Sequence, residues 1–219
     1  MVECLSCGRR QEPRLICADC GTPLSAALDS FAALGFPRKL SIDLAALERS
    51  YHELSRKIHP DQFASREAAI RDASLRATAL LTRSYRTLRD PTLRGLYWLE
   101  LIGEKLAENN KRVPTELAEL VFEVQEQLAG MQDAPADSDA ARELASDVVK
   151  RRGELQATMD ETVAELERNF IQWDQRSPGI AENDRAKLTT ELKAILSKIA
   201  YLRTLIRDVD RALENSKAA

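Results

Sequence analysis

The segment from Asp43 to Leu88 reads DLAALERSYHELSRKIHPDQFASREAAIRDASLRATALLTRSYRTL, and it decides the fold. Its first part spaces apolar residues three and four apart, which predicts an amphipathic helix that stops at Pro60. The part from Glu67 to Leu88 repeats this spacing and adds alanines that permit close packing. His59-Pro60-Asp61 falls in the short loop between them. The segment therefore predicts an antiparallel helical hairpin.

The flanking sequence predicts further helices on both sides of the hairpin. A short helix around Leu28, Phe31 and Leu34 precedes it, and a helix opened by Asp90-Pro91 and closed by Gly103 follows. After a polar stretch, three apolar stripes are separated by turns at residues 130–138 and 177–179, and the last two repeat every three or four residues. Stripes of this kind with short connections are typical of an antiparallel three-helix bundle.

Composition supports an all-α protein of several parts. Hydrophobic residues make up 44% of the 219 residues and charged residues 31%, whereas Gly and Pro number only 8 each, too few for an all-β fold. We expect a Cys-rich segment at 1–24, a helical domain at 25–103, a linker at 104–114 and a bundle at 115–219. The sequence has no apolar run near the roughly 18 residues of a membrane span and no visible signal peptide, so we expect a cytoplasmic protein without membrane contact.

The charge distribution argues against nucleic-acid binding. The net charge is −3, but residues 25–103 carry 12 basic and 9 acidic side chains, whereas residues 104–219 carry 17 basic and 23 acidic ones. Nucleic-acid binding needs clustered Lys and Arg, which an acidic chain with one mildly basic region lacks. This distribution favours contacts with other proteins through complementary charge.

The four cysteines form two CxxC pairs within the first 20 residues, each followed by glycine. Their spacing predicts a structural Cys4 zinc site, with Cys4, Cys7, Cys17 and Cys20 as ligands. Glycine after each pair allows a positive φ, which turns backbone N–H groups toward the thiolates. Two disulfides or a redox CxxC are the alternatives; the first conflicts with a reducing cytosol and the second needs a βαβ setting. Four thiolates complete a tetrahedral site, so we expect zinc to fold this segment rather than to catalyse a reaction.

The His59-Pro60-Asp61 loop is the second candidate site. Proline restricts its own φ and the conformation of His59, so the histidine and aspartate project from a stiff loop. Two other roles are possible: His59 and Asp61 could cap the two hairpin helices, or they could form a catalytic pair. The catalytic pair has neither a nucleophile nor a phosphate-binding loop near it in the sequence.

At this point the sequence resembles the J domain of DnaJ-type co-chaperones, and more closely the HscB family of iron–sulfur cluster assembly. The similarity rests on motifs in and around the hairpin: Phe31-x-x-Leu34-Gly35, Tyr51-x-x-Leu54, His59-Pro60-Asp61-x-Phe63 and Leu88-Arg89-Asp90-Pro91-x-x-Arg94-Gly95-Leu96-Tyr97. Members of this family join a J domain to a three-helix bundle, and some also carry an N-terminal CxxC…CxxC module. The resemblance implies a co-chaperone rather than an enzyme.

The resemblance also implies two partners and the residues that bind them. His59, Pro60 and Asp61 would contact a DnaK- or HscA-class chaperone and stimulate its ATPase, with Arg49, Arg56 and Lys57 as a basic face that steers association. The bundle would hold the iron–sulfur scaffold IscU through an apolar patch that maps to Leu120, Val121, Val124, Leu128 and Tyr201. The alternative for these apolar side chains is the bundle core.

Two other functions stay open at the level of sequence. The chain could be a J-protein for an unrelated client, with the bundle as its binding module. It could also be a zinc-ribbon nucleic-acid binder, although the cysteine segment has only one basic cluster, Arg9-Arg10, and no aromatic residue on which bases could stack.

Overall fold

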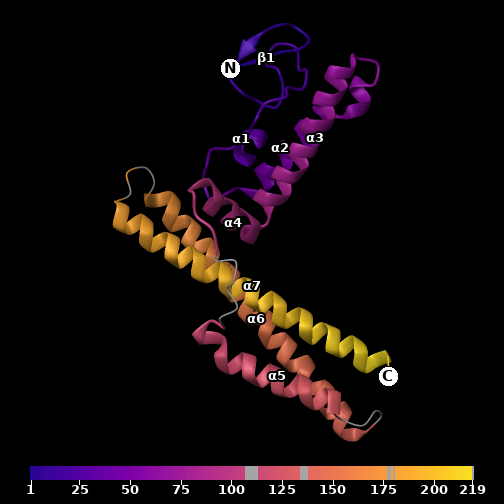
Figure 1. The fold of residues 1–219 in the computed structure, drawn as a ribbon, viewed down its shortest axis with the longest axis vertical. Coiled ribbons are helices and arrows are strands. Elements are labelled where there is room, and N and C mark those ends of the chain that lie inside the picture. Colours follow the sequence, from indigo (N-terminus) through magenta and orange to yellow (C-terminus); the bar gives the residue numbers. More distant parts are fainter. Residues whose placement is uncertain (107–112, 134–137, 177–178, 180, 219) are drawn as a thin grey trace. The chain divides into compact units, whose positions relative to one another are not determined.

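The computed structural model describes residues 1–106, 113–133, 138–176, 179 and 181–218, and it is helical beyond the N-terminal segment. The chain divides into two compact units, Met1–Trp98 and Leu99–Ala219 (Figure 1). The first unit contains the cysteine segment together with the hairpin, and the second contains the bundle.

The cysteine segment is built on a very short antiparallel sheet. Strand β1 (Val2–Glu3) pairs with β2 (Arg10–Gln11), so that Val2 lies opposite Gln11. Cys4, Cys17 and Leu24 form a small buried cluster with Val2 packed against it. Strands of two residues leave no periodic pattern in a sequence, which is why this sheet was not predicted.

The helical hairpin forms where it was predicted. Helix α1 (Ser30–Leu34) precedes α2 (Leu44–Ile58), and α3 (Ala68–Arg89) returns antiparallel to α2. Asp43 caps α2 by accepting the N–H groups of Ala45 and Ala46. The predicted loop contains a 3₁₀ turn, η1 (Pro60–Phe63), because Pro60 supplies the φ that its first position needs.

The family motifs around the hairpin occupy its core. Phe31 is fully buried and stacks near Tyr97, whose hydroxyl accepts the N–H of Ser30 at 2.9 Å. Tyr51 and Tyr85 stack across α2 and α3 with ring centroids 4.2 Å apart. Helix α4 (Pro91–Leu101) begins at the predicted proline, and buried Arg94 donates to the carbonyl of Leu88 at 2.7 Å. These contacts tie α1 and the start of α4 to the hairpin.

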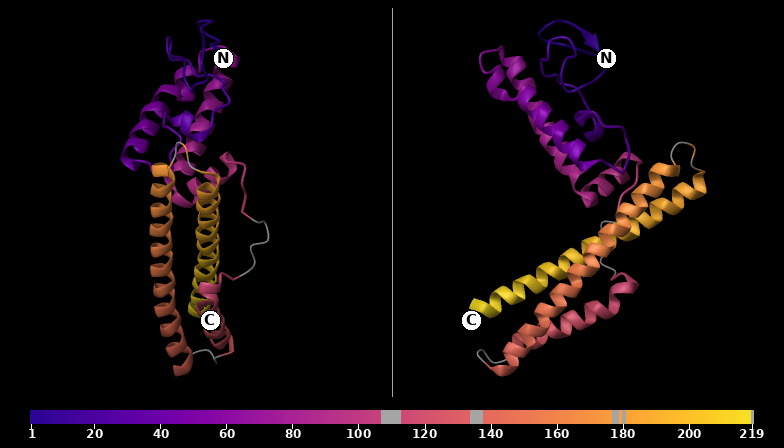
Figure 2. Two further views of the ribbon diagram at one scale, coloured as in Figure 1. Left: turned by 90° about the vertical axis from the view of Figure 1, so that its left-hand side faces the viewer. Right: turned by 180° about the vertical axis from the view of Figure 1, so that it is seen from behind.

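The second unit is an antiparallel helical bundle. A 3₁₀ turn, η2 (Thr115–Leu117), leads into α5 (Ala118–Asp133), followed by α6 (Asp139–Arg176) and α7 (Glu182–Ala218). Figure 2 shows α6 and α7 side by side, with α5 along one end of the pair. The turn predicted from residue 130 begins later, because α5 continues through Gly130 to Asp133. Most of the predicted linker, and parts of the turns at 130–138 and 177–179, lie outside the described residues.

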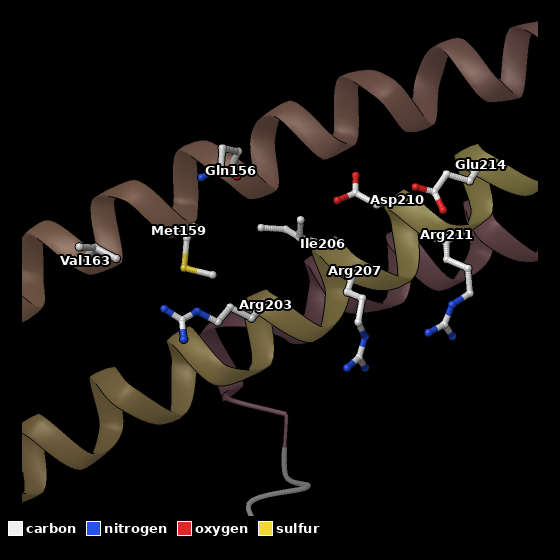
Figure 3. A pocket seen from close by; sticks show the side chains of 9 residues that line it. All are labelled: Gln156, Met159, Val163, Arg203, Ile206, Arg207, Asp210, Arg211 and Glu214. Atoms are coloured by element: carbon white, nitrogen blue, oxygen red, sulfur yellow. The ribbon is translucent and has the colours of Figure 1, made fainter. Parts of the chain in front are cut away.

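The predicted apolar stripes of α6 and α7 form the bundle core, with three exceptions. Leu155, Leu166 and Leu192 are fully buried, but Val163, Ile206 and Leu213 are only half-buried. Helix α5 has 16 residues against 38 in α6 and 37 in α7, so it covers only part of the pair. Val163 and Ile206 instead line an open groove between α6 and α7, to which α5 contributes no side chain (Figure 3).

Candidate functional sites: the cysteine cluster and the His-Pro-Asp loop

The four cysteine side chains meet at one point, as their spacing predicts. All four Sγ atoms lie within 4.8 Å of one another, with Cys4 to Cys20 at 3.5 Å and Cys7 to Cys17 at 3.7 Å. A disulfide needs about 2.05 Å between sulfurs. Four thiolates around one zinc ion, each about 2.3 Å from the metal, lie about 3.8 Å from one another. The spacing therefore fits a tetrahedral metal site and not two disulfides.

Two matching turns bring the cysteines together. The N–H of Gly8 donates to the carbonyl of Cys4 at 2.9 Å, and the N–H of Gly21 donates to that of Cys17 at 3.1 Å. Both glycines have φ of 70°, a left-handed conformation in which a side chain is strained. The predicted role of glycine after each CxxC pair is confirmed in this respect.

Hydrogen bonds to the sulfurs divide the thiols into two kinds. The backbone N–H of Cys20 and the Gln11 amide, which lies 3.0 Å from Cys17 Sγ, lower the pKa of Cys17 to about 6. The Thr22 hydroxyl, 3.2 Å from Cys20 Sγ, lowers the pKa of Cys20. The N–H of Arg9 also lowers the pKa of Cys7, but desolvation and the neighbouring thiols outweigh it and raise this pKa to about 12. Thiolates this close together repel one another, and a bound cation would offset that repulsion.

The cluster thus fits a divalent metal held by four thiolates. Zinc is the metal that such structural sites most often hold, and iron also accepts four thiolates. Because the protein fills every tetrahedral position, the cluster suits a structural rather than a catalytic role.

The His-Pro-Asp loop presents its polar side chains to solvent. The side chain of His59 is 54% exposed and that of Asp61 is 89% exposed. His59 Nδ1 accepts the N–H of Asp61 at 3.3 Å and lies 3.4 Å from Asp61 Oδ2. The histidine therefore caps the start of the 3₁₀ turn, and the Asp61 side chain beside it is exposed to water.

Other residues satisfy the backbone where α2 ends. The buried hydroxyl of Ser74 donates to the carbonyl of Ile58 at 2.7 Å, and Gln62 Nε2 donates to the carbonyl of Arg56 at 2.6 Å. At the start of α3, Glu67 occupies the cap position without a side-chain hydrogen bond. The alternative in which His59 and Asp61 cap the two long helices is therefore wrong. Their exposed polar atoms are available to a partner.

A basic face runs along α2 toward this loop. Arg49, Arg56 and Lys57 are exposed, as predicted, and helical spacing places them on one side of α2. Lys57 pairs with Glu53 at 2.6 Å, and this ion pair lowers the pKa of Glu53. Among the described residues, no ion pair involves Arg49 or Arg56, and both side chains are exposed to solvent.

The predicted scaffold patch does not lie on one surface. Val121 and Val124 are 5% and 1% exposed and belong to the bundle core, so the prediction of an exposed patch fails for these two residues. Their helical position faces both α6 and α7, which pack against α5. Leu120 and Leu128, at the edges of that stripe, are half-buried, and so is Tyr201 on α7.

Sequence reasoning missed the most exposed apolar side chain of α5. Phe122 is 68% exposed. Phe122 lies outside the predicted apolar stripe of this helix, which consists of Leu117, Leu120, Val121, Val124 and Leu128. An aromatic residue outside an apolar stripe is the signal that could have revealed this exposed side chain. No helix within the described residues is long and apolar enough to cross a membrane.

A four-cysteine module that fits a metal ion, a hairpin with an exposed His-Pro-Asp loop, and a helical bundle are together the features of a J-domain co-chaperone. Comparisons with known proteins narrow this class. Over 139 residues the chain is 32% identical to the "Co-chaperone protein HscB homolog" of Chromobacterium violaceum, covering 63% of this chain and 76% of that protein. Over 156 residues it is 30% identical to the "Iron-sulfur cluster co-chaperone protein HscB" of Homo sapiens, covering 68% of this chain and 64% of that protein. The chain belongs to the HscB family of co-chaperones.

Solved structures show the same fold. The crystal structure of human co-chaperone protein HscB is similar with a TM-score of 0.67 at 24% identity, over 95% of this chain and 97% of that one. Chaperone HscB from Vibrio cholerae has a TM-score of 0.61 at 21% identity, over 86% of this chain and 99% of that one. No family model matches the chain.

Proposed function

We propose that this protein binds an IscU-type iron–sulfur scaffold, presents it to a DnaK- or HscA-class chaperone and stimulates that chaperone's ATPase. The observation that carries the proposal is the separation of roles in the His-Pro-Asp loop. Ser74 and Gln62 hold the end of α2, while the carboxylate of Asp61 is 89% exposed. A loop held in place by other residues keeps its functional side chains for a partner.

The J-domain unit would act in two steps. Arg49 and Arg56, which lack ion pairs among the described residues, steer the basic face of α2 onto an acidic surface of the chaperone. Asp61 then pairs with an arginine of the chaperone, and the hydrogen bond from its N–H to His59 Nδ1 fixes the direction of the carboxylate. Hydrolysis takes place in the chaperone, so this chain stimulates the reaction without catalysing it.

The bundle would hold the scaffold through the partly exposed residues of the predicted patch, Leu120, Leu128 and Tyr201. The buried Val121 and Val124 would support this surface from beneath. Phe122 adds an exposed aromatic side chain on α5, and such side chains often anchor interfaces.

The metal module would have a structural role with zinc. When bound, zinc would compensate the charge of four thiolates from Cys4, Cys7, Cys17 and Cys20 and fix the two glycine turns. Four reduced thiols are typical of the cytoplasm, where we place the protein.

Steady-state ATPase of an HscA-type chaperone tests the proposal. We expect this protein to raise the rate, and we expect IscU added with it to raise the rate further. The matched control is the variant His59→Gln, which replaces an exposed side chain and keeps the helices. We expect this variant not to raise the ATPase rate. A rate that this protein leaves unchanged, with or without IscU, would refute the proposal.

A further inference from the structure

A groove lies between the metal module and the first helices of the J-domain unit. Its volume is about 720 Å³. Leu15 of the module and Leu34 of α1 line it as buried residues, and Ile16 and Leu54 line it as half-buried ones. The apolar surface left for a partner to cover is that of the half-buried Ile16 in the module and Leu54 on α2.

The groove adjoins the basic face of α2. Lys57 belongs to that face and also lines the groove, together with Glu53 one turn earlier. Arg49 and Arg56 follow around the same helix, because positions 49, 53, 56 and 57 share one side. A protein docked on the basic face thus reaches the edge of the groove.

A side-chain hydrogen bond joins the metal module to the segment that follows the His-Pro-Asp loop. The guanidinium of Arg66 donates to the hydroxyl of Ser6, between Cys4 and Cys7, at 3.0 Å. The N–H of Arg66 itself donates to the carbonyl of Phe63, at the end of the 3₁₀ turn. A single residue therefore contacts both the metal turn and the loop that carries Asp61.

The unpaired charges around the groove are mainly positive. In the module, Arg9 pairs with Asp19 and Arg10 pairs with Glu3. Within the described part of the chain, no ion pair involves Arg14, which lines the groove. The groove lining itself holds one unpaired charge of each sign, Arg14 and Glu12. Arg49 and Arg56, on the exposed face of α2 that adjoins the groove, add two further cations without ion pairs among the described residues. These charges complement an acidic partner.

We propose that this groove receives an acidic segment of the same DnaK-class chaperone, with an apolar side chain inserted between Ile16 and Leu54. The metal module is then a second contact for the chaperone and more than a folded appendage. This inference rests on the proposed function, because it extends the surface on which the chaperone is proposed to dock.

The test compares two double variants of the full-length protein. Arg14→Ala/Ile16→Asp alters the groove, and Arg10→Ala/Leu5→Asp makes the same changes on exposed module residues that do not line it. Titration with an ATP-bound DnaK-class chaperone should show Kd raised about tenfold for the groove variant, which is about 1.4 kcal/mol, and by less than about twofold for the control. At saturation, stimulation should equal that of the unaltered protein, because Asp61 is intact.

A second measurement needs no substitution. Hydrogen exchange of the unaltered protein should slow at residues 14–16 when the chaperone binds. This measurement tests the inference even if the groove variant loses its metal and cannot be compared with the control. If the unaltered protein neither binds nor stimulates the chaperone, the proposed function fails. If it does both, but residues 14–16 exchange as before, only this inference fails. The inference is also overturned if the groove variant loses scaffold binding or self-association in place of chaperone affinity.

Discussion

The His-Pro-Asp loop and helix α5 are both proposed to bind partners. In the loop, the residues that stabilise the fold differ from those proposed to contact the partner, whereas on α5 one stripe of residues provides both. At the loop, Ser74 and Gln62 satisfy the backbone, and His59 and Asp61 face solvent. On α5, a single apolar stripe supplies both the core, through Val121 and Val124, and the surface edge, through Leu120. Substitutions in the loop should therefore change function alone, whereas substitutions on α5 should change function and stability together.

Metal removal should produce the largest effect, and it should be confined to the cysteine segment. A segment of about 24 residues buries too little surface to fold by itself, so the free energy of metal binding is its folding free energy. A chelator, or Cys4→Ser with Cys17→Ser, should unfold the first 24 or so residues and leave both helical regions intact. Metal analysis and hydrogen exchange measure this.

The prediction fails if anaerobically purified protein is metal-free with two disulfides. Loss of the whole helical circular-dichroism signal on chelation would show that the helices also depend on the metal.

The double substitution Val121→Ala/Val124→Ala should cost several kcal/mol of unfolding free energy, because each buried valine loses roughly 2 kcal/mol of packing. Phe122→Ala is the control on the same helix; it is 68% exposed and should change stability by less than about 0.5 kcal/mol. Thermal melts of the full chain measure both. Equal melting temperatures for the double variant and the unaltered protein would show that these valines are not core residues and would restore them as candidates for the scaffold-binding surface.

Leu120→Ala should have a smaller effect on stability and a clear one on binding. The side chain is half-buried, so it should lose less packing energy than either valine. As a proposed anchor, it should weaken IscU binding by about 1–2 kcal/mol in a titration. If binding is unchanged, Leu120 does not belong to the scaffold surface.

Ser74→Ala should destabilise the hairpin by about 1 kcal/mol, because the carbonyl of Ile58 loses its short hydrogen bond from a buried donor and keeps only the longer one from the Thr78 hydroxyl at 3.4 Å. Ser84→Ala is a matched control on α3: this serine is also buried, but its hydroxyl has no hydrogen-bond partner within the described residues. We expect that control to be neutral or slightly stabilising in urea unfolding. A loss as large as that of Ser74→Ala would remove the special role of the Ser74 bond.

The sequence predicted most of the architecture because helices and metal ligands leave regular signals. The three- and four-residue spacings of Tyr51, Leu54 and Ile58 depend only on helix geometry, and the CxxC pairs depend only on the short chain between the two cysteines. The bond from Ser74 to Ile58 was not predicted, because it joins two segments that share no repeat. The 3₁₀ turn at Pro60–Phe63 is local, but it is too short to leave a periodic pattern in the sequence.

The position of α5 shows the same limit. Spacing indicated that Leu120, Val121 and Val124 lie on one side of the helix, but not how far α6 and α7 enclose that side. Burial of the two valines follows from that enclosure, which no local pattern contains. The exposure of His59 and Asp61, by contrast, could be predicted because Pro60 restricts the loop locally.

The central claim is that the His-Pro-Asp loop serves recognition and not folding, and one paired measurement tests it most directly. Asp61→Asn removes the charge of a side chain that is 89% exposed. Thermal melting and stimulation of chaperone ATPase are measured on the same preparation. We predict an unchanged melting temperature and loss of stimulation. Full stimulation by Asp61→Asn, or a melting temperature lowered by several degrees, would contradict the claim.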